Sequence, residues 1–448
     1  MDFNTFKNYV IAAAKAQGIE EYELYYQASE SVSVGVFKHE INEFSSSVEG
    51  GVCFRCIVYG HMGYASTEEL SAASAADVVA RAADNARILE TEEPEFLVEG
   101  GQTYEPLDIK PYDLPAPAQL VETVLKTEQA LYAADPAVID GSSASASTDK
   151  RTIAIVNSKG LDLHYENNVS LVMAEAVVSD GNEMTNAYKA KAGSFAELDL
   201  AELVKEPVAD AKAQLGADVA PTGAYPVVFA PKAMAGLLRT FASCFSSEST
   251  QRGLSLLDGK EGETIAAPIV TLVDDPFYPE SQTPINFDAE GSPAVKKNVV
   301  ESGVLTTLLY NLKTAAVAGR KTTGNAAKAG YNATVTVRPF TMYLAPGDLS
   351  EEELLKKAGN GVYIDSLGGM HAGANVISGD FSLQSGGFMI ENGEKTTPVK
   401  SFTVAGNFYS LLKQITAIAD KVELPGFGGI TAFGSPAVLV EGLTIAGK

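Results

Sequence analysis

The sequence has no tryptophan, only three cysteines and no long apolar run. Cys53, Cys56 and Cys244 are too few for a disulfide framework and fit a reducing compartment, so we expect a cytoplasmic protein. No run of about 18 uncharged apolar residues is present, so no membrane-spanning segment is expected. Residues 1–4 lack a basic segment followed by an apolar stretch, so we also expect no signal peptide.

Basic residues are scarce as well. Lysine and arginine number 33 against 57 aspartates and glutamates, which gives a formal charge of −24. No dense cluster of basic residues offsets this charge, so we expect no direct binding of nucleic acid. We interpret the acidity as a source of solubility.

The composition is that of a globular protein. Hydrophobic residues make up 46% and charged residues 20% of the chain, both near globular averages. A length of 448 residues predicts two or three domains that can bury large cores.

The order of periodic segments predicts an α+β fold with two domains. Residues 1–220 should form an N-terminal α+β domain with a mixed sheet and helices, because helical spacing alternates there with strands such as Val32, Val34 and Val36. The order of helix, strands, helix, helix, strands, helix indicates a duplicated unit. Residues 216–224 form the best boundary. Residues 221–448 should form a β-rich domain that is barrel-like or built on a curved sheet.

Several elements can be placed more closely. We predict a helix over about 197–215 whose second half begins at Pro207. In the second domain, a strand over 225–230 should precede a helix that begins at Pro231 and runs to about Phe245. A helix near 350–358 and strands over 404–412 and 437–443 should follow.

The residues alone give no catalytic constellation. Cys53 and Cys56 have CxxC spacing, but zinc would need a second ligand pair, and on the predicted strand the two side chains point to opposite faces. His371 lies in the glycine-rich stretch 368–373, where it is either a general base or a backbone contact. No nucleophile elbow, phosphate loop or dinucleotide fingerprint is present.

Short motifs in a fixed order are more informative. In the second half they are Phe287-Asp-Ala-Glu-Gly291, Ser302-Gly-Val-Leu305, Leu309-Tyr-Asn311, Thr323-Gly-Asn325, Ser378-Gly-Asp-Phe381 and Ile390-Glu-Asn-Gly393. With Glu49-Gly-Gly-Val52 and Gly60-His-Met-Gly63, this set resembles the TldD/PmbA family of metallopeptidases, whose members have also been labelled modulators of DNA gyrase. Each motif is weak alone, but the ordered set is specific and covers essentially the whole chain.

The resemblance also implies how this chain departs from the active members. Those carry His-Glu-x-x-x-His on the helix of the second domain, and a cysteine near the C-terminus is a third metal ligand. In this sequence Arg239 stands at the first histidine, Thr240 at the glutamate and Cys244 at the second histidine, and residues 425–436 contain no cysteine. Arginine stays protonated and repels a dication. The chain is therefore similar to the PmbA (TldE) branch, and we expect it to bind no metal and to be inactive alone.

The leading hypothesis is a non-catalytic subunit of a heterodimeric metalloprotease that processes small unfolded peptides. The partner implied by the resemblance is a TldD-like His-Glu-x-x-x-His subunit, which alone would hold zinc, and the isolated chain should form a homodimer. Extended peptides could pair with the β-rich domain. Arg239, Glu248, Arg252 and His371 are candidates for lining the substrate cavity.

Two alternatives from other functional classes remain. The first is a protein that modulates DNA gyrase through protein contacts, with no catalytic activity. The second is a self-standing hydrolase with Cys244 as its nucleophile, which requires a depressed thiol pKa and a nearby base.

Overall fold

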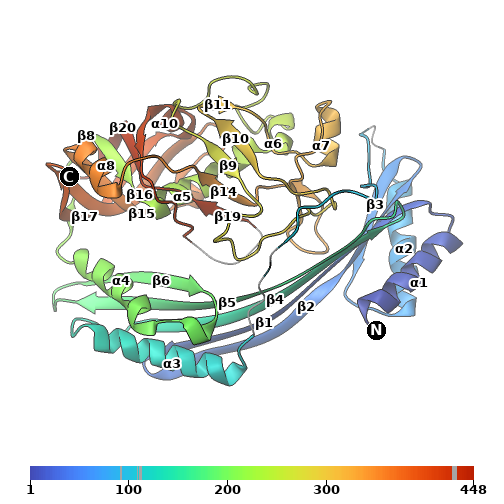
Figure 1. Ribbon diagram of the computed structural model, residues 1–448, viewed down its shortest axis with the longest axis horizontal. Helices are drawn as coiled ribbons and strands as arrows, with labels where there is room; N and C mark the ends of the chain where they lie inside the picture. The colour runs from blue at the N-terminus through green and yellow to red at the C-terminus, as the bar shows by residue number, and fades with distance from the viewer. Residues whose placement is uncertain (91–92, 108, 110–113, 426–430) are drawn as a thin grey trace.

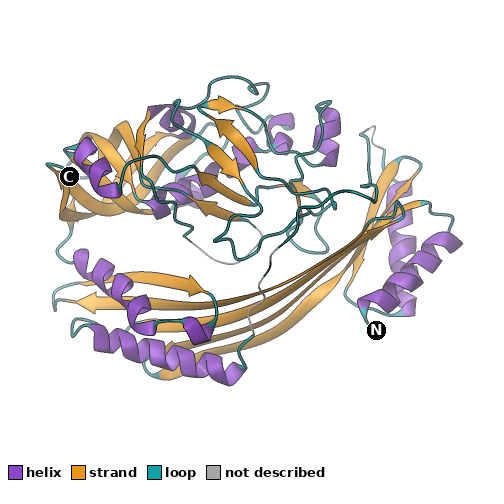
Figure 2. Cartoon of the chain, in the orientation of Figure 1, coloured by secondary structure: helices purple, strands orange, loops and turns teal. Residues whose placement is uncertain are grey.

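A long, curved, six-stranded sheet forms the N-terminal half of the protein, and a β-rich domain lies over its inner face (Figure 1). The computed structural model describes residues 1–90, 93–107, 109, 114–425 and 431–448. Figure 2 shows that helices cover the outer face of the long sheet near its two ends. The predicted α+β class is confirmed.

The N-terminal elements alternate as expected. Their bounds are α1 Phe3–Ala16, β1 Glu21–Phe37, β2 Glu40–Val58, β3 His61–Thr67, α2 Ala72–Arg87, α3 Pro117–Ala134, β4 Ser143–Asn157, β5 Asp162–Ser179, β6 Met184–Ala192, a 3-10 turn Phe195–Glu197 and α4 Leu200–Ala213. The sheet order is β3-β2-β1-β4-β5-β6, with antiparallel neighbours throughout, so the sheet is not the mixed one that was predicted. Two three-stranded units thus meet at the β1–β4 pair, which agrees with the duplicated order of elements.

Each half of this sheet has its own helical cover. Strand positions alternate between faces, so Val34 and Val36 turn the same way and pack with helices α3 and α4 at one end. Helices α1 and α2 pack at the other end, against Phe54 and Cys56 of β2. The opposite face of the sheet is left for the second domain.

The C-terminal elements are shorter and more numerous. Their bounds are β7 Asp218–Val219, β8 Gly223–Phe229, α5 Pro231–Phe241, a 3-10 turn Ala242–Phe245, α6 Ser247–Gln251, β9 Leu272–Asp274, β10 Lys297–Glu301, β11 Val304–Leu305, α7 Leu312–Val317, β12 Ala326–Ala327, β13 Thr336–Val337, β14 Thr341–Leu344, α8 Glu351–Ala358, β15 Gly361–Gly368, α9 Met370–Gly373, β16 Asp380–Glu391, β17 Glu394–Asn407, α10 Phe408–Gln414, β18 Ile415–Ile418, β19 Ala432–Gly434 and β20 Val438–Ala446.

A closed barrel forms the centre of this domain. Strands β20, β8, β15, β16 and β17 pair in that order, and β17 pairs back to β20, which closes a ring of five strands. A second sheet, β11-β10-β9-β14-β19, lies beside it. No helix in the described part of the chain has the length and apolarity needed to cross a bilayer.

Two predicted elements differ from the structure. The segment 404–412 is not one strand: β17 ends at Asn407, whose side chain accepts from the Ser410 N–H and caps helix α10. Helix α4 agrees with the prediction, since its second half begins at Pro207. Helix α5 ends at Phe241, where the chain tightens into a 3-10 turn over 242–245.

Candidate functional site

Helix α5 carries the positions that the resemblance assigns to the metal motif. Pro231 occupies the first turn, where its missing N–H costs nothing. Leu237, Leu238 and Phe241 face the core, and the Phe241 ring stacks on Phe408 at a centroid distance of 4.6 Å. Arg239 lies on the other side of this helix and is exposed to solvent.

The other two motif positions are occupied by groups unsuited to zinc. The Thr240 hydroxyl donates to the Gly236 carbonyl at 2.8 Å and lies 2.9 Å from Met370 Sδ of helix α9. Cys244 is 1% exposed, and burial raises the pKa of its thiol far above the usual range, which keeps it protonated at neutral pH. Among the described residues, no group of three or more His, Cys, Asp or Glu side chains could hold a metal ion. These residues do not fit the zinc that the family implies.

The remaining predicted site residues lie near this helix. His371 is exposed on α9, next to the Met370 that contacts Thr240. Glu248 lies on α6, and Arg252, which follows α6, forms an ion pair with it at 3.3 Å. Arg239 and Arg252 are exposed and Glu248 is half-buried. The role of these four residues in a substrate cavity stays a prediction.

A densely hydrogen-bonded polar cluster lies elsewhere, between the two domains. Three motifs of the second half converge there. Asp288 Oδ2 accepts from the Ala326 N–H at 2.9 Å, while its Oδ1 accepts from the Glu290 and Ser292 N–H groups. Glu290 Oε2 accepts from the Leu312 N–H at 2.9 Å. Segments 287–292, 309–312 and 323–326 therefore form one hydrogen-bonded unit, since the Thr323 hydroxyl also accepts from the Tyr310 N–H.

Strand β2 of the N-terminal sheet joins this unit through Arg55. Its Nε donates to Glu23 Oε1 at 2.8 Å, and its Nη1 lies 3.7 Å from Glu290 Oε1. All three side chains are at most 5% exposed. Burial raises the pKa of Glu23 and Glu290, and Arg55 opposes both shifts. Burial also raises the pKa of Asp288, and the nearby Glu290 raises it further.

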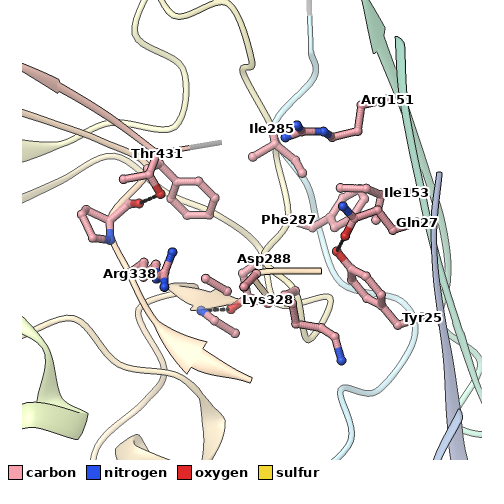
Figure 3. Close-up of a pocket in the computed structure, with 16 residues that line it drawn as sticks. Tyr25, Gln27, Arg151, Ile153, Ile285, Phe287, Asp288, Lys328, Arg338 and Thr431 are labelled. Carbon is pink, nitrogen blue, oxygen red and sulfur yellow. Dashed lines mark hydrogen bonds between the residues drawn. The ribbon is translucent and has the colours of Figure 1, made fainter. Parts of the chain in front are cut away.

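A cavity of about 320 Å³ adjoins this cluster at the domain interface (Figure 3). Residues of β1 and β4, including Tyr25 and Arg151, form its N-terminal wall. The C-terminal domain forms the rest, from segments 285–289, 326–329, 338–340 and Thr431. Thr431 directly precedes β19, on which helix α5 packs, so the cavity and the motif helix share a neighbouring strand.

The cavity is lined by none of the predicted site residues. Sequence reasoning missed it because one wall comes from residues 25–27 and 151–153 and the other from residues between 285 and 431. One signal was present: Glu23 and Arg55 are charged residues within short apolar stretches, with Leu24 next to the first and Phe54 next to the second. Buried charges of this kind need a partner, but the partner Glu290 cannot be located from sequence spacing.

Three family profiles match the chain. Residues 222–447 match the PmbA/TldA metallopeptidase C-terminal domain, residues 22–86 match its domain 1, and residues 110–215 match its central domain.

Individual relatives agree with the profiles. A metalloprotease of Methanothermobacter thermautotrophicus is 32% identical over 286 residues, which is 62% of this chain and 62% of that protein's length. A Thermotoga maritima structure, of a suggested modulator of a DNA gyrase, is 30% identical with a TM-score of 0.89 and covers 99% of this chain and 100% of its own. The structure of TldE from Thermococcus kodakarensis is 25% identical with a TM-score of 0.87, covering 98% and 99%.

Proposed function

The chain belongs to the PmbA/TldD metallopeptidase family, and from this premise we propose that it is a non-catalytic, metal-free subunit of a heterodimeric metalloprotease. Its partner would be a TldD-like subunit with the His-Glu-x-x-x-His motif, which supplies the zinc. The pair would process small unfolded peptides in the cytoplasm. This chain would help to enclose the substrate.

The occupancy of the motif positions carries the proposal. A hydrolytic zinc site needs three protein ligands and a general base. Arg239 is a permanent cation, Thr240 has its hydroxyl engaged with Gly236, and Cys244 is a buried thiol. Helix α5 therefore lacks the ligands that would bind a metal and activate a water molecule. The similarity to TldE over nearly the whole chain supports the same branch.

The alternative of a cysteine hydrolase has less support. A nucleophilic cysteine needs a thiolate within reach of a base. Burial raises the pKa of Cys244, which disfavours the thiolate. Arg239 is exposed on helix α5, whereas Cys244 is buried in the 3-10 turn that follows it. The name of the Thermotoga maritima relative keeps gyrase modulation as a second candidate.

Purification of the native complex tests the proposal. The chain, tagged at its chromosomal locus, should co-purify in equal amounts with a family member that carries His-Glu-x-x-x-His. Unfolded peptides should be cleaved by the pair and not by this chain alone. Metal chelation should abolish the cleavage. Recovery of a gyrase subunit without that family member, or cleavage by the isolated chain that Cys244→Ala abolishes, would contradict the proposal.

A further inference from the structure

The interdomain cavity is positively charged, although the protein as a whole carries a formal charge of −24. Its charged lining residues are Arg151, Lys328, Arg338 and Asp288. Burial raises the pKa of Asp288 and lowers that of Lys328, so both are shifted towards their neutral forms and the two arginines supply the net positive charge. Low-dielectric walls concentrate the field of such charges, so the cavity should attract an anion.

Two guanidinium groups have unused hydrogen-bonding capacity. Arg151 reaches the cavity from β4, and its buried Nε has no hydrogen-bond partner among the described residues. The ion pair of Arg151 with Asp149 is long, at 3.8 Å. Arg338 enters from the C-terminal domain and forms no ion pair within the described part of the chain (Figure 3). Lys328 instead lies over the Tyr25 ring, 5.0 Å from its centroid.

The rest of the wall is apolar. Ile153, Ile285, Phe287 and Phe340 are each at most 6% exposed, and all four line the cavity. A volume of about 320 Å³ is at the lower end of the range of ligand pockets. An inorganic anion would use only the arginines. A carboxylate attached to an apolar side chain would use both the arginines and the apolar wall.

We propose that this cavity binds the C-terminal residue of a peptide, with Arg151 pairing with the carboxylate and the apolar wall beside it receiving the side chain, while Arg338 across the cavity adds positive charge (Figure 3). Guanidinium groups bind carboxylates through parallel, charge-assisted hydrogen bonds. The inference rests on the proposed function for the source of the ligand. It deepens that function by naming the end of the substrate that this subunit holds.

Binding to the isolated full-length chain tests this inference without the partner subunit. Calorimetry should compare an N-acetylated tripeptide ending in phenylalanine with the same peptide as a C-terminal amide. The free acid should bind at least about tenfold more tightly, because the amide lacks the charge that the arginines recognise. Free phenylalanine should bind more weakly than the tripeptide, since its ammonium group is repelled by the cavity.

Variants separate the roles of the two arginines. Arg151→Met should weaken binding of the free acid by roughly 10- to 100-fold, with much less effect on the amide, whereas Arg338→Met should weaken it by less, because it removes a charge across the cavity and no direct contact. Arg87→Met, an exposed arginine on α2, should leave binding unchanged. Thermal unfolding should show that each variant is folded. If Arg151→Met does not fold, Arg151→Lys carries the test, because lysine keeps the charge but loses the paired donors of the guanidinium.

Four results would overturn the inference: equal binding of acid and amide, no binding of either, inorganic phosphate binding as tightly as the acid, or free phenylalanine binding more tightly than the tripeptide. The result of the binding experiment can be distinguished from the result of the test of the proposed function. Tight binding without a co-purifying family member would refute only the heterodimer, and a co-purifying family member without binding would refute only the cavity.

Discussion

Replacing Arg55 by methionine should destabilise the protein through the two carboxyl groups that the change leaves behind. Arg55 is 5% exposed and contacts Glu23 and Glu290, which are 1% and 5% exposed. Methionine keeps most of the apolar stem and removes the charge. Breaking a buried ion pair from one side costs about 3–5 kcal/mol, because the remaining charge has no compensation.

The loss should depend on pH. Burial raises the pKa of Glu23 while Arg55 lowers it, so removing Arg55 raises that pKa further. A carboxyl whose folded pKa exceeds its unfolded pKa of about 4.3 contributes stability below the unfolded value, and that contribution is lost as the pH rises through the folded value. The deficit of Arg55→Met against wild type should therefore be smaller near pH 5 than near pH 8.

Urea unfolding followed by circular dichroism measures this deficit in a chain without tryptophan. The matched control is Arg87→Met, which removes an exposed ion pair with Asp84 and should cost at most about 1 kcal/mol. Adding Glu23→Gln and Glu290→Gln to Arg55→Met should restore part of the loss. If Arg55→Met is no more destabilising than Arg87→Met at any pH, the buried charges do not stabilise the interface as argued.

Two further predictions concern other buried groups. Asp288→Asn should lower the free energy of unfolding by roughly 1–3 kcal/mol at acid pH, because an amide nitrogen cannot accept from the Ala326 N–H. Since the pKa of Asp288 is raised in the folded protein, this difference from wild type should become smaller as the pH rises from about 4 towards neutrality. A difference that stays constant across urea titrations at these pH values would contradict the prediction. All three cysteines are buried, so a thiol reagent should label none in the native protein and all three after unfolding; rapid native labelling of Cys244 would reopen the hydrolase alternative.

Local patterns predicted the fold class because the strands show their period directly. Alternation at Val32, Val34 and Val36 marks β1, and glycine turns separate the strands of both domains. The same reasoning failed at 404–412. There Asn407 caps a helix that buries Phe408 and Leu411. Asparagine is a favoured capping residue, but the alternation of apolar and small residues before it led to the prediction of a strand. Closure of the barrel depends on the β17–β20 pairing, which no local pattern specifies.

The CxxC motif shows how strand geometry decides between chemistry and packing. The two cysteines were predicted to point to opposite faces of one strand. In the structure Cys56 packs with Phe54 among helices α1 and α2, whereas Cys53 packs in the interdomain core with Tyr25 and Phe287. Both faces of β2 are buried here, so the apolar pattern alone could not show which face meets the second domain.

The motifs at residues 287–291, 309–311 and 323–325 are joined in this chain by hydrogen bonds between side chains and backbone. Loss of the Asp288 carboxylate would leave three buried N–H groups without their acceptor, and each such group costs about 1–3 kcal/mol. Asp288 therefore has a structural role that does not involve Arg239 or Thr240. The same hydrogen bonds fix segment 323–326, which leads directly into the cavity wall at Lys328. These hydrogen bonds therefore help to hold the cavity wall in place between the two domains.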